Sequence, residues 1–211
     1  MVFYKKPQED TYMDKKAFWK KINPVNWVEL ASPVTLAFAG LSLMALIIGG
    51  LTGGASTRAL FSVYRSSPAS FLFYPRLFLH VLGHANYAHY AANMALFLVL
   101  GPIIEKQYGA KKLIIMILIT ALMTGLFHLL ISPNAAALGA SGIVFMFILL
   151  SAASGRKNRK VPLTLLLVAI IYLGREIAGG VFGQDNVSQI AHLVGGVCGW
   201  VFGMFYQKKQ A

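Results

Sequence analysis

The sequence has little cysteine and little charge. Its 211 residues include one cysteine, Cys198, and seven acidic residues, and charged residues make up 12% of the chain. A single cysteine forms no disulfide framework and supplies no cysteine ligand set for a metal. Soluble globular domains average about 25% charged residues, whereas 57% of this chain is hydrophobic and its mean hydropathy is +0.63. This composition indicates a polytopic membrane protein.

The positive charge lies in short clusters. The formal net charge of +12 could indicate a nucleic-acid partner. The nineteen lysines and arginines, however, fall mostly between apolar runs, which is typical of membrane topology. We therefore expect the lipid bilayer as a partner and no nucleic acid.

Six apolar segments can be identified. They cover about 33–52, 83–104, 113–131, 141–154, 161–178 and 188–206. Lipid offers the backbone no hydrogen-bond partner, so each segment is predicted to be an α-helix. The predicted fold is all-α, a six-helix transmembrane bundle. The core is expected at 33–206, between a basic N-terminal tail at 1–32 and a short C-terminal tail at 207–211.

The basic residues predict the orientation of these helices. Fifteen of the nineteen fall in the N-terminal tail, in the loops after the second and fourth segments, or at the C-terminus. Cytoplasmic loops carry an excess of lysine and arginine. Both termini are therefore predicted to be cytoplasmic, in the cell (inner) membrane.

Two segments depart from a plain bundle. The loop at about 53–82 is long and rich in aromatic residues, and loops of this length are usually functional. We expect it to pack on or into the outer leaflet. The short fourth segment would span only about 20 Å of a hydrocarbon core about 30 Å thick. Its outer end, at Ser141, is predicted to start below the membrane surface.

Several polar side chains are predicted to share this outer depth. Polar groups inside a membrane are costly and are candidates for function. His89 and Asn93 are four residues apart, so they share one helix face. The set consists of Ser141, His192, His84, His89 and Asn93.

A serine beside a neutral imidazole is the smallest set for nucleophilic acyl transfer, because the imidazole takes the hydroxyl proton and returns it to the leaving group. No carboxylate is predicted at the depth of His192, so the prediction is a dyad of Ser141 and His192. His89, Asn93 and the backbone N–H of Ser141 are the candidate donors to an oxyanion. Packing is the alternative for each residue taken alone. His80 and His128 have no evident partner and are interpreted as structural.

Small residues predict how the two helices meet. Gly195, Gly199 and Gly203 recur every fourth residue, and such stripes let helix backbones approach closely. Gly139 and Gly142 flank Ser141 and offer a similarly thin surface. If these stripes pack together, the His192 imidazole lies within reach of the Ser141 hydroxyl.

Three motifs in this order resemble the rhomboid intramembrane serine proteases. They are "HANYAHYAAN", which contains His89 and Asn93, "GASG" around Ser141, and "AHLVGGVCG" from Ala191 to Gly199. "RLFLH" and "GPIIEKQYG" match as well, and the resemblance covers about residues 33–205.

The resemblance implies a nucleophile at Ser141, a general base at His192, and oxyanion side chains at His89 and Asn93. It also implies an aromatic ring stacked on the catalytic histidine at Phe145, where many members have tyrosine. The implied substrates are transmembrane segments of membrane proteins, admitted beside the fifth span. No metal or cofactor is implied.

Other functions remain as alternatives. A catalytically inactive rhomboid-like protein would bind membrane clients without cleaving them. A small transporter would require repeats and a polar midplane site, and neither is evident. A structural role in complex assembly makes no demand on Ser141 or His192. The sequence does not predict an oligomeric state.

Overall fold

The computed structural model describes residues 32–132, 134–153 and 186–206, together with the isolated positions 163, 167 and 170. Within these residues the chain is α-helical, and its β-structure is a single isolated bridge. The predicted fifth span and the two predicted tails, apart from Ser32, lie largely outside the described residues. The chain divides between Ala31 and Ser32, and the fold is described from Ser32 onward.

Three described helices are long and apolar enough to cross a membrane. They are α2 (Pro33–Leu51), α5 (Tyr87–Tyr108) and α6 (Ala110–Ile131). Two further apolar helices are α7 (Ser141–Ala153), with 13 residues, and α9 (Asn186–Phe205). The all-α class and the integral membrane character are therefore confirmed, whereas the count of six spans stays a prediction.

The second span begins later than the sequence predicts. α5 starts at Tyr87, because Asn86 caps the helix by accepting a hydrogen bond from the backbone N–H of His89 at 2.9 Å. Side-chain acceptors at this position replace the partner that first-turn N–H groups lack. His84 therefore lies in the preceding loop and not in the helix, which corrects the expected start near residue 83.

Glu105, near the C-terminal end of α5, caps the N-terminus of α2. Its Oε1 accepts from the backbone N–H of Val34 at 3.0 Å. Its Oε2 accepts from the backbone N–H and the hydroxyl of Thr35 at 2.9 and 2.8 Å. A carboxylate satisfies first-turn N–H groups and is favoured at the positive end of the helix dipole. This bond set fixes α2 against α5.

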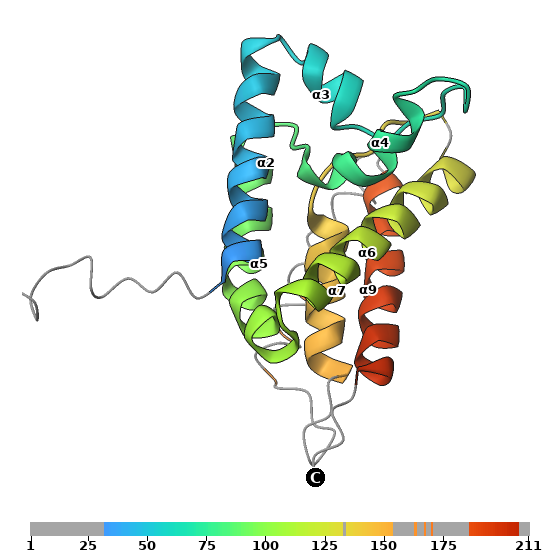
Figure 1. The fold of residues 1–211 in the computed structure, drawn as a ribbon. Helices are drawn as coiled ribbons and strands as arrows, with labels where there is room; N and C mark the ends of the chain where they lie inside the picture. Colours follow the sequence, from blue (N-terminus) through green and yellow to red (C-terminus); the bar gives the residue numbers. More distant parts are fainter. Residues whose placement is uncertain are drawn as a thin grey trace, which may run out of the picture. The chain divides into compact units, whose positions relative to one another are not determined.

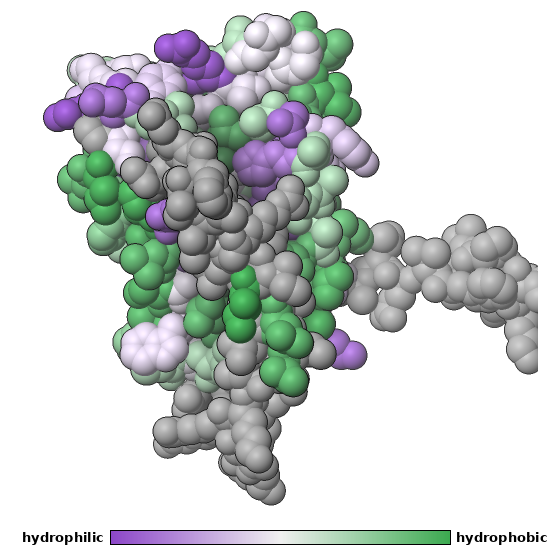
Figure 2. Space-filling model, turned by 180° about the vertical axis from the view of Figure 1, so that it is seen from behind, coloured by the Kyte–Doolittle hydropathy of each residue, from purple (hydrophilic) through white to green (hydrophobic). Residues whose placement is uncertain are grey.

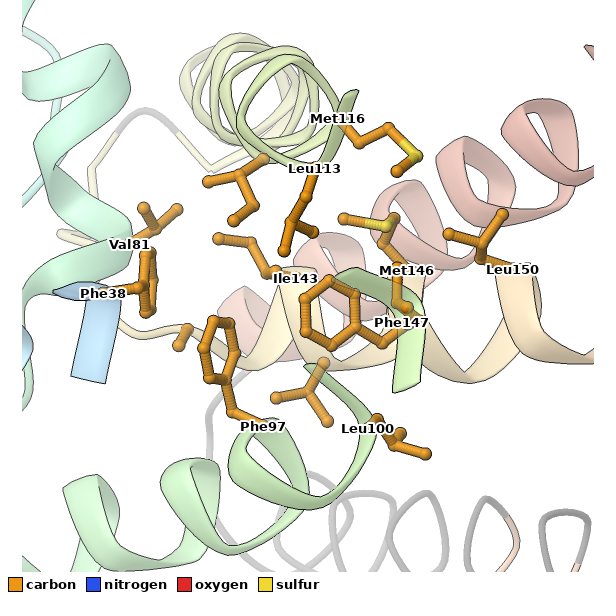
Figure 3. Close-up of a cluster of buried hydrophobic side chains, with 14 of the residues drawn as sticks. Phe38, Val81, Phe97, Leu100, Leu113, Met116, Ile143, Met146, Phe147 and Leu150 are labelled. Carbon is orange, nitrogen blue, oxygen red and sulfur yellow. The ribbon is translucent and has the colours of Figure 1, made fainter. Parts of the chain in front are cut away.

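The core lies where α2, α5, α6 and α7 meet (Figure 3). The ring of Phe97 stacks on Phe38 with centroids 4.5 Å apart and lies 5.1 Å from the ring of Phe147. α7 is buried over most of its surface, as expected for a helix that is apolar all round. It is therefore an interior helix, and its first residue is Ser141.

α7 and α9 lie side by side along their length (Figure 1). A side chain at Gly195 would collide with the backbone carbonyl of Gly142, and one at Gly199 would collide with the carbonyl of Met146. Further along, a side chain at Gly203 would meet Ala153. We call these backbone contacts the α7–α9 seam.

The long loop between α2 and α5 is folded. It contains α3 (Ala55–Leu60), α4 (Phe73–Leu79) and the 3₁₀ turn η2 (His80–Leu82). An antiparallel bridge joins Val63 to Ala137, in the segment that precedes α7. Residues 52–86 and 134–140 thus form one structural region, which we call the loop end.

Candidate active site

Ser141 is the first residue of α7 and follows a tight backbone bend. Gly139 has φ of 129°, a conformation that side chains with a Cβ rarely adopt. The carbonyl of Ala140 accepts hydrogen bonds from the N–H groups of Ile143 and Val144 at 2.9 and 3.0 Å. The amide of Ser141 belongs to the first turn, where N–H groups have no acceptor inside the helix. The hydroxyl and this amide therefore lie together at the helix N-terminus.

His192 lies on α9 beside the first turns of α7. Its side chain is 3% exposed, and its ring stacks on Phe145 with centroids 4.4 Å apart and planes 23° from parallel. Phe145 is four residues after Ser141, so both lie on one face of α7. The imidazole thus packs, from a facing helix, on a residue that lies one helical turn from Ser141.

The α7–α9 seam accounts for this proximity. A Cβ on Gly142, next to Ser141, would lie 3.2 Å from the carbonyl oxygen of Ala191, next to His192. Gly195, on the next turn of α9, packs against the carbonyl of Gly142. The close backbone approach at Gly142 and Gly195 therefore sets the positions of Ser141 and His192.

His89 approaches Ser141 from α5. A Cβ placed on Gly139 would lie 3.0 Å from His89 Nε2 and 4.0 Å from Ser141 Oγ. The imidazole and the hydroxyl thus lie around the same point of the backbone. The N–H of Ala85 donates to His89 Nδ1 at 3.5 Å, which leaves the ring proton on Nε2. His89 is therefore oriented with an N–H toward the segment that carries Ser141.

Asn93 lies one turn further along α5 and is 1% exposed. Its Nδ2 donates a hydrogen bond to the carbonyl of His89 at 3.0 Å. This bond fixes the amide orientation, with the NH₂ group on the face shared with His89. Asn93 and His89 thus form one polar stripe on α5.

Two histidines that the sequence leaves without a partner hold the segment before Ser141. The carbonyl of His80 accepts from the N–H of Gly139 at 2.9 Å, and His80 Nε2 bonds the hydroxyl of Thr124 at 3.3 Å. His128 Nε2 donates to the carbonyl of Ala135 at 2.9 Å. Both side chains are buried. Their structural interpretation agrees with these contacts, and the sequence gives no sign that they support the segment preceding Ser141.

His84 lies beside the site, in the loop before α5. Its Nδ1 donates to the carbonyl of Leu82 at 3.1 Å, and its ring meets His89 edge-on with centroids 5.1 Å apart. Burial, and to a smaller extent the neighbouring His89, lower the pKa of His84 from 6.5 to about 4. His84 is therefore neutral near pH 7. Its contacts orient the start of α5.

The structure thus brings together most of the residues that the sequence singles out. Ser141, Phe145 and His192 lie along adjoining faces of α7 and α9. His89 approaches Ser141 from α5, and Asn93 lies one turn further along that helix. Such an arrangement supplies a hydroxyl, an imidazole and several N–H donors in a largely buried setting, where electrostatic interactions are stronger than in water. This chemistry is that of acyl transfer.

Comparisons with known proteins find two similarities. The family model of the Rhomboid domain matches residues 73–209. Rhomboid protease GluP of Bacillus subtilis (strain 168) is 26% identical over 170 residues, which cover 77% of this chain and 33% of that protein. The chain therefore spans about one third of the length of this relative. The family match begins at α4, so α2 lies outside it.

Proposed function

The chain belongs to the rhomboid family of intramembrane proteases, and from this premise we propose that it is a serine endopeptidase acting within the membrane. Ser141 is the proposed nucleophile and His192 the proposed general base. The observation that supports this most is the His192 ring, stacked on Phe145 one helical turn from Ser141.

In the proposed reaction, His192 takes the proton of the Ser141 hydroxyl as the oxygen attacks the substrate carbonyl. The imidazolium then protonates the leaving amine, and an acyl-enzyme remains. Water hydrolyses this ester, with His192 as the base once more. Neither step requires a cofactor.

The orientation of His192 is proposed to come from packing. Glu105 is the one acid among the residues that the structure describes, and it caps α2 at the far end of α5. It lies 16 residues after His89, or about 24 Å along the helix. Stacking on Phe145 supplies the orientation that a carboxylate supplies in a triad.

Three donors are proposed for the oxyanion: the backbone N–H of Ser141, the Nε2–H of His89 and the NH₂ group of Asn93. The helix α7 holds the Ser141 amide before the reaction. The Ala85 N–H holds the His89 ring, and the His89 carbonyl holds the Asn93 amide. Preorganised donors of this kind contribute about 3–4 kcal/mol each to transition-state stabilisation.

The proposed substrates are transmembrane segments of other membrane proteins. A helical substrate hides its carbonyls in hydrogen bonds, so it must unwind locally before Ser141 can attack. We propose that the loop end faces away from the cytoplasm and that both termini are cytoplasmic, as the basic residues predict. The core at 33–206, the tails and the cell-membrane location belong to this proposal.

The test uses the full chain in liposomes with a single-span test substrate. Wild type should cleave it, whereas Ser141→Ala and His192→Ala should each leave no measurable cleavage. Ser42→Ala is the matched control, because Ser42 is buried in α2 and should leave the rate unchanged. Cleavage that survives loss of Ser141 would exclude the proposal. Substrate binding without cleavage by wild type would favour the inactive, client-binding alternative.

A further inference from the structure

A cavity of about 710 Å³ opens at the loop end, beside the outer turns of α2. Its walls come from the last turns of α2, from α3 and the segment after it, and from the short segments that precede α5 and α7. Figure 2 shows hydrophilic residues gathered toward this end of the molecule and hydrophobic residues covering the helix flanks below. The volume falls within the range of about 300–1,000 Å³ typical of small-molecule sites.

The lining carries positive charge and no carboxylate. Arg58 and Arg65 both line the cavity and are solvent-exposed. Neither has an acidic partner among the described residues, since Glu105, at the opposite end of α5, is the one acid there. Asn86 and Asn134 add neutral hydrogen-bonding groups. An anion would therefore be favoured in this cavity.

A third arginine, Arg76, holds the backbone next to Arg58 and Arg65. Buried Arg76 donates from Nε to the carbonyl of Ala59 at 2.8 Å and from Nη1 to the hydroxyl of Ser66 at 3.3 Å. Ala59 and Ser66 directly follow Arg58 and Arg65 in the sequence. The Val63–Ala137 bridge ties the same segment to the segment before α7. The cavity is thus built before any ligand arrives, which lowers the entropic cost of binding.

One wall of the cavity is apolar and continues onto a lipid-facing helix. Leu46 and Leu138 line the cavity. On the same stretch of α2, Met44, Ile47 and Leu51 are 57%, 53% and 83% exposed, as expected for side chains that face acyl chains. A ligand with an anionic head and an apolar tail would match both parts of this wall.

We propose that this cavity binds the phosphate headgroup of an anionic phospholipid, with Arg58 and Arg65 on the phosphate and an acyl chain along the outer half of α2. Guanidinium groups bind phosphate oxygens in paired, charge-assisted hydrogen bonds. Anionic lipids are also attracted to basic groups at the membrane surface. The inference depends on the membrane character of the chain and not on its proposed catalytic activity.

An acidic segment of a protein substrate is the competing ligand, because Ala136 and Leu138 lead toward Ser141. The observations favour a lipid for two reasons. The cavity adjoins the exposed apolar face of α2, where a phospholipid already lies when the protein is in a bilayer. An acidic peptide has no acyl chain, so it would not cover Leu46 or the exposed apolar face of α2.

The test measures lipid binding to the delipidated full chain in neutral detergent by native mass spectrometry. Phosphatidylglycerol is titrated against wild type, Arg58→Gln/Arg65→Gln, and Lys106→Gln/Lys111→Gln as a control with the same change of charge at the other end of α5. We expect the Kd for phosphatidylglycerol to rise at least tenfold in the arginine variant and to change less than twofold in the lysine variant. Equal weakening in both variants would overturn the site.

Further measurements distinguish a lipid from a free phosphate or an acidic peptide, and they control for misfolding of the arginine variant. Asn134→Asp keeps both arginines and adds a carboxylate to an exposed position of the cavity, and it should also weaken binding. Lipid should slow hydrogen exchange at residues 54–66 and 134–138 in wild type. Glycerol phosphate or an acidic peptide that binds as tightly as the lipid would overturn the lipid assignment, as would unchanged exchange in both segments.

Discussion

Along the α7–α9 seam, glycines bring two backbones into contact, whereas at the loop end hydrogen bonds from two buried histidines hold the backbone. The seam sets Ser141 opposite His192 through contacts at Gly142 and Gly195. At the loop end the backbone carbonyl of His80 holds Gly139, and the side chain of His128 holds Ala135. At the seam an added methyl group would collide with the facing backbone, whereas at the loop end each side-chain hydrogen bond can be removed separately by mutation. The two regions should therefore respond differently to mutation.

The largest expected effect is at Asn93 on α5, where a proposed hydrogen-bond donor acts on the reaction and not on the seam or the loop end. Asn93→Ala removes a proposed oxyanion donor and should lower kcat by about 10²–10³-fold with little change in KM, because the interaction forms in the transition state. Steady-state kinetics in detergent measure this effect. Thermal unfolding should show a folded protein, and an unchanged kcat would contradict the proposed role.

The next effect tests the seam. Gly195→Ala places a methyl group against the Gly142 carbonyl. Overpacking of this kind costs about 1–3 kcal/mol, so Tm and cleavage rate should both fall, the rate about tenfold or more. Gly196→Ala is the matched control, because its Cβ would lie 3.6 Å from Leu149 in ordinary contact. Equal effects of the two substitutions would mean that the seam does not position Ser141.

A smaller effect is expected where one hydrogen bond supports the loop end. Thr124→Val removes the hydroxyl that bonds His80 Nε2 and should cost about 1 kcal/mol. Hydrogen exchange at residues 134–140 should speed up, with a cleavage rate reduced only a few-fold. Thr120→Val is the control one turn away, because Thr120 enters this network through its carbonyl, which valine retains. Faster exchange in the control alone would contradict the assigned role of Thr124.

The smallest effect on cleavage at neutral pH comes from histidine titration, which should lower the stability of the loop end only in acid. Burial lowers the pKa of both His80 and His84 to about 4, from about 6.5. Between these values the unfolded chain binds more protons than the folded one, so stability falls as the pH drops from 6.5 to 4 and is constant above 6.5. Tm measured from pH 8 to pH 4 should follow this course. His84→Asn should show a shallower fall, and a slope equal to that of wild type would refute the role of His84.

The seam was accessible to sequence reasoning, whereas the loop end was not. Glycines spaced four apart on one helix, with others flanking Ser141, predict close backbone approach because periodicity is local information. His80 and His128 bind backbone groups of Gly139 and Ala135. Every residue carries such groups, so the sequence gives no sign of which one is the partner.

Helix ends show the same limit. The apolar run before α5 extended the predicted second span to residue 83, but the cap at Asn86 starts the helix at Tyr87. The sequence also gives no sign that Glu105 caps α2, because its partners Val34 and Thr35 lie about 70 positions earlier in the sequence. Long-range polar contacts to backbone groups are the part of this fold that only the structure supplies.

The central claim is that the Ser141 hydroxyl is activated by the His192 imidazole. The most direct measurement treats the detergent-solubilised protein with a fluorophosphonate and locates the adduct by mass spectrometry. We predict one adduct, on Ser141, in wild type, and its loss in His192→Ala with the fold retained. An adduct that persists without His192, or that forms on another serine, would contradict the account.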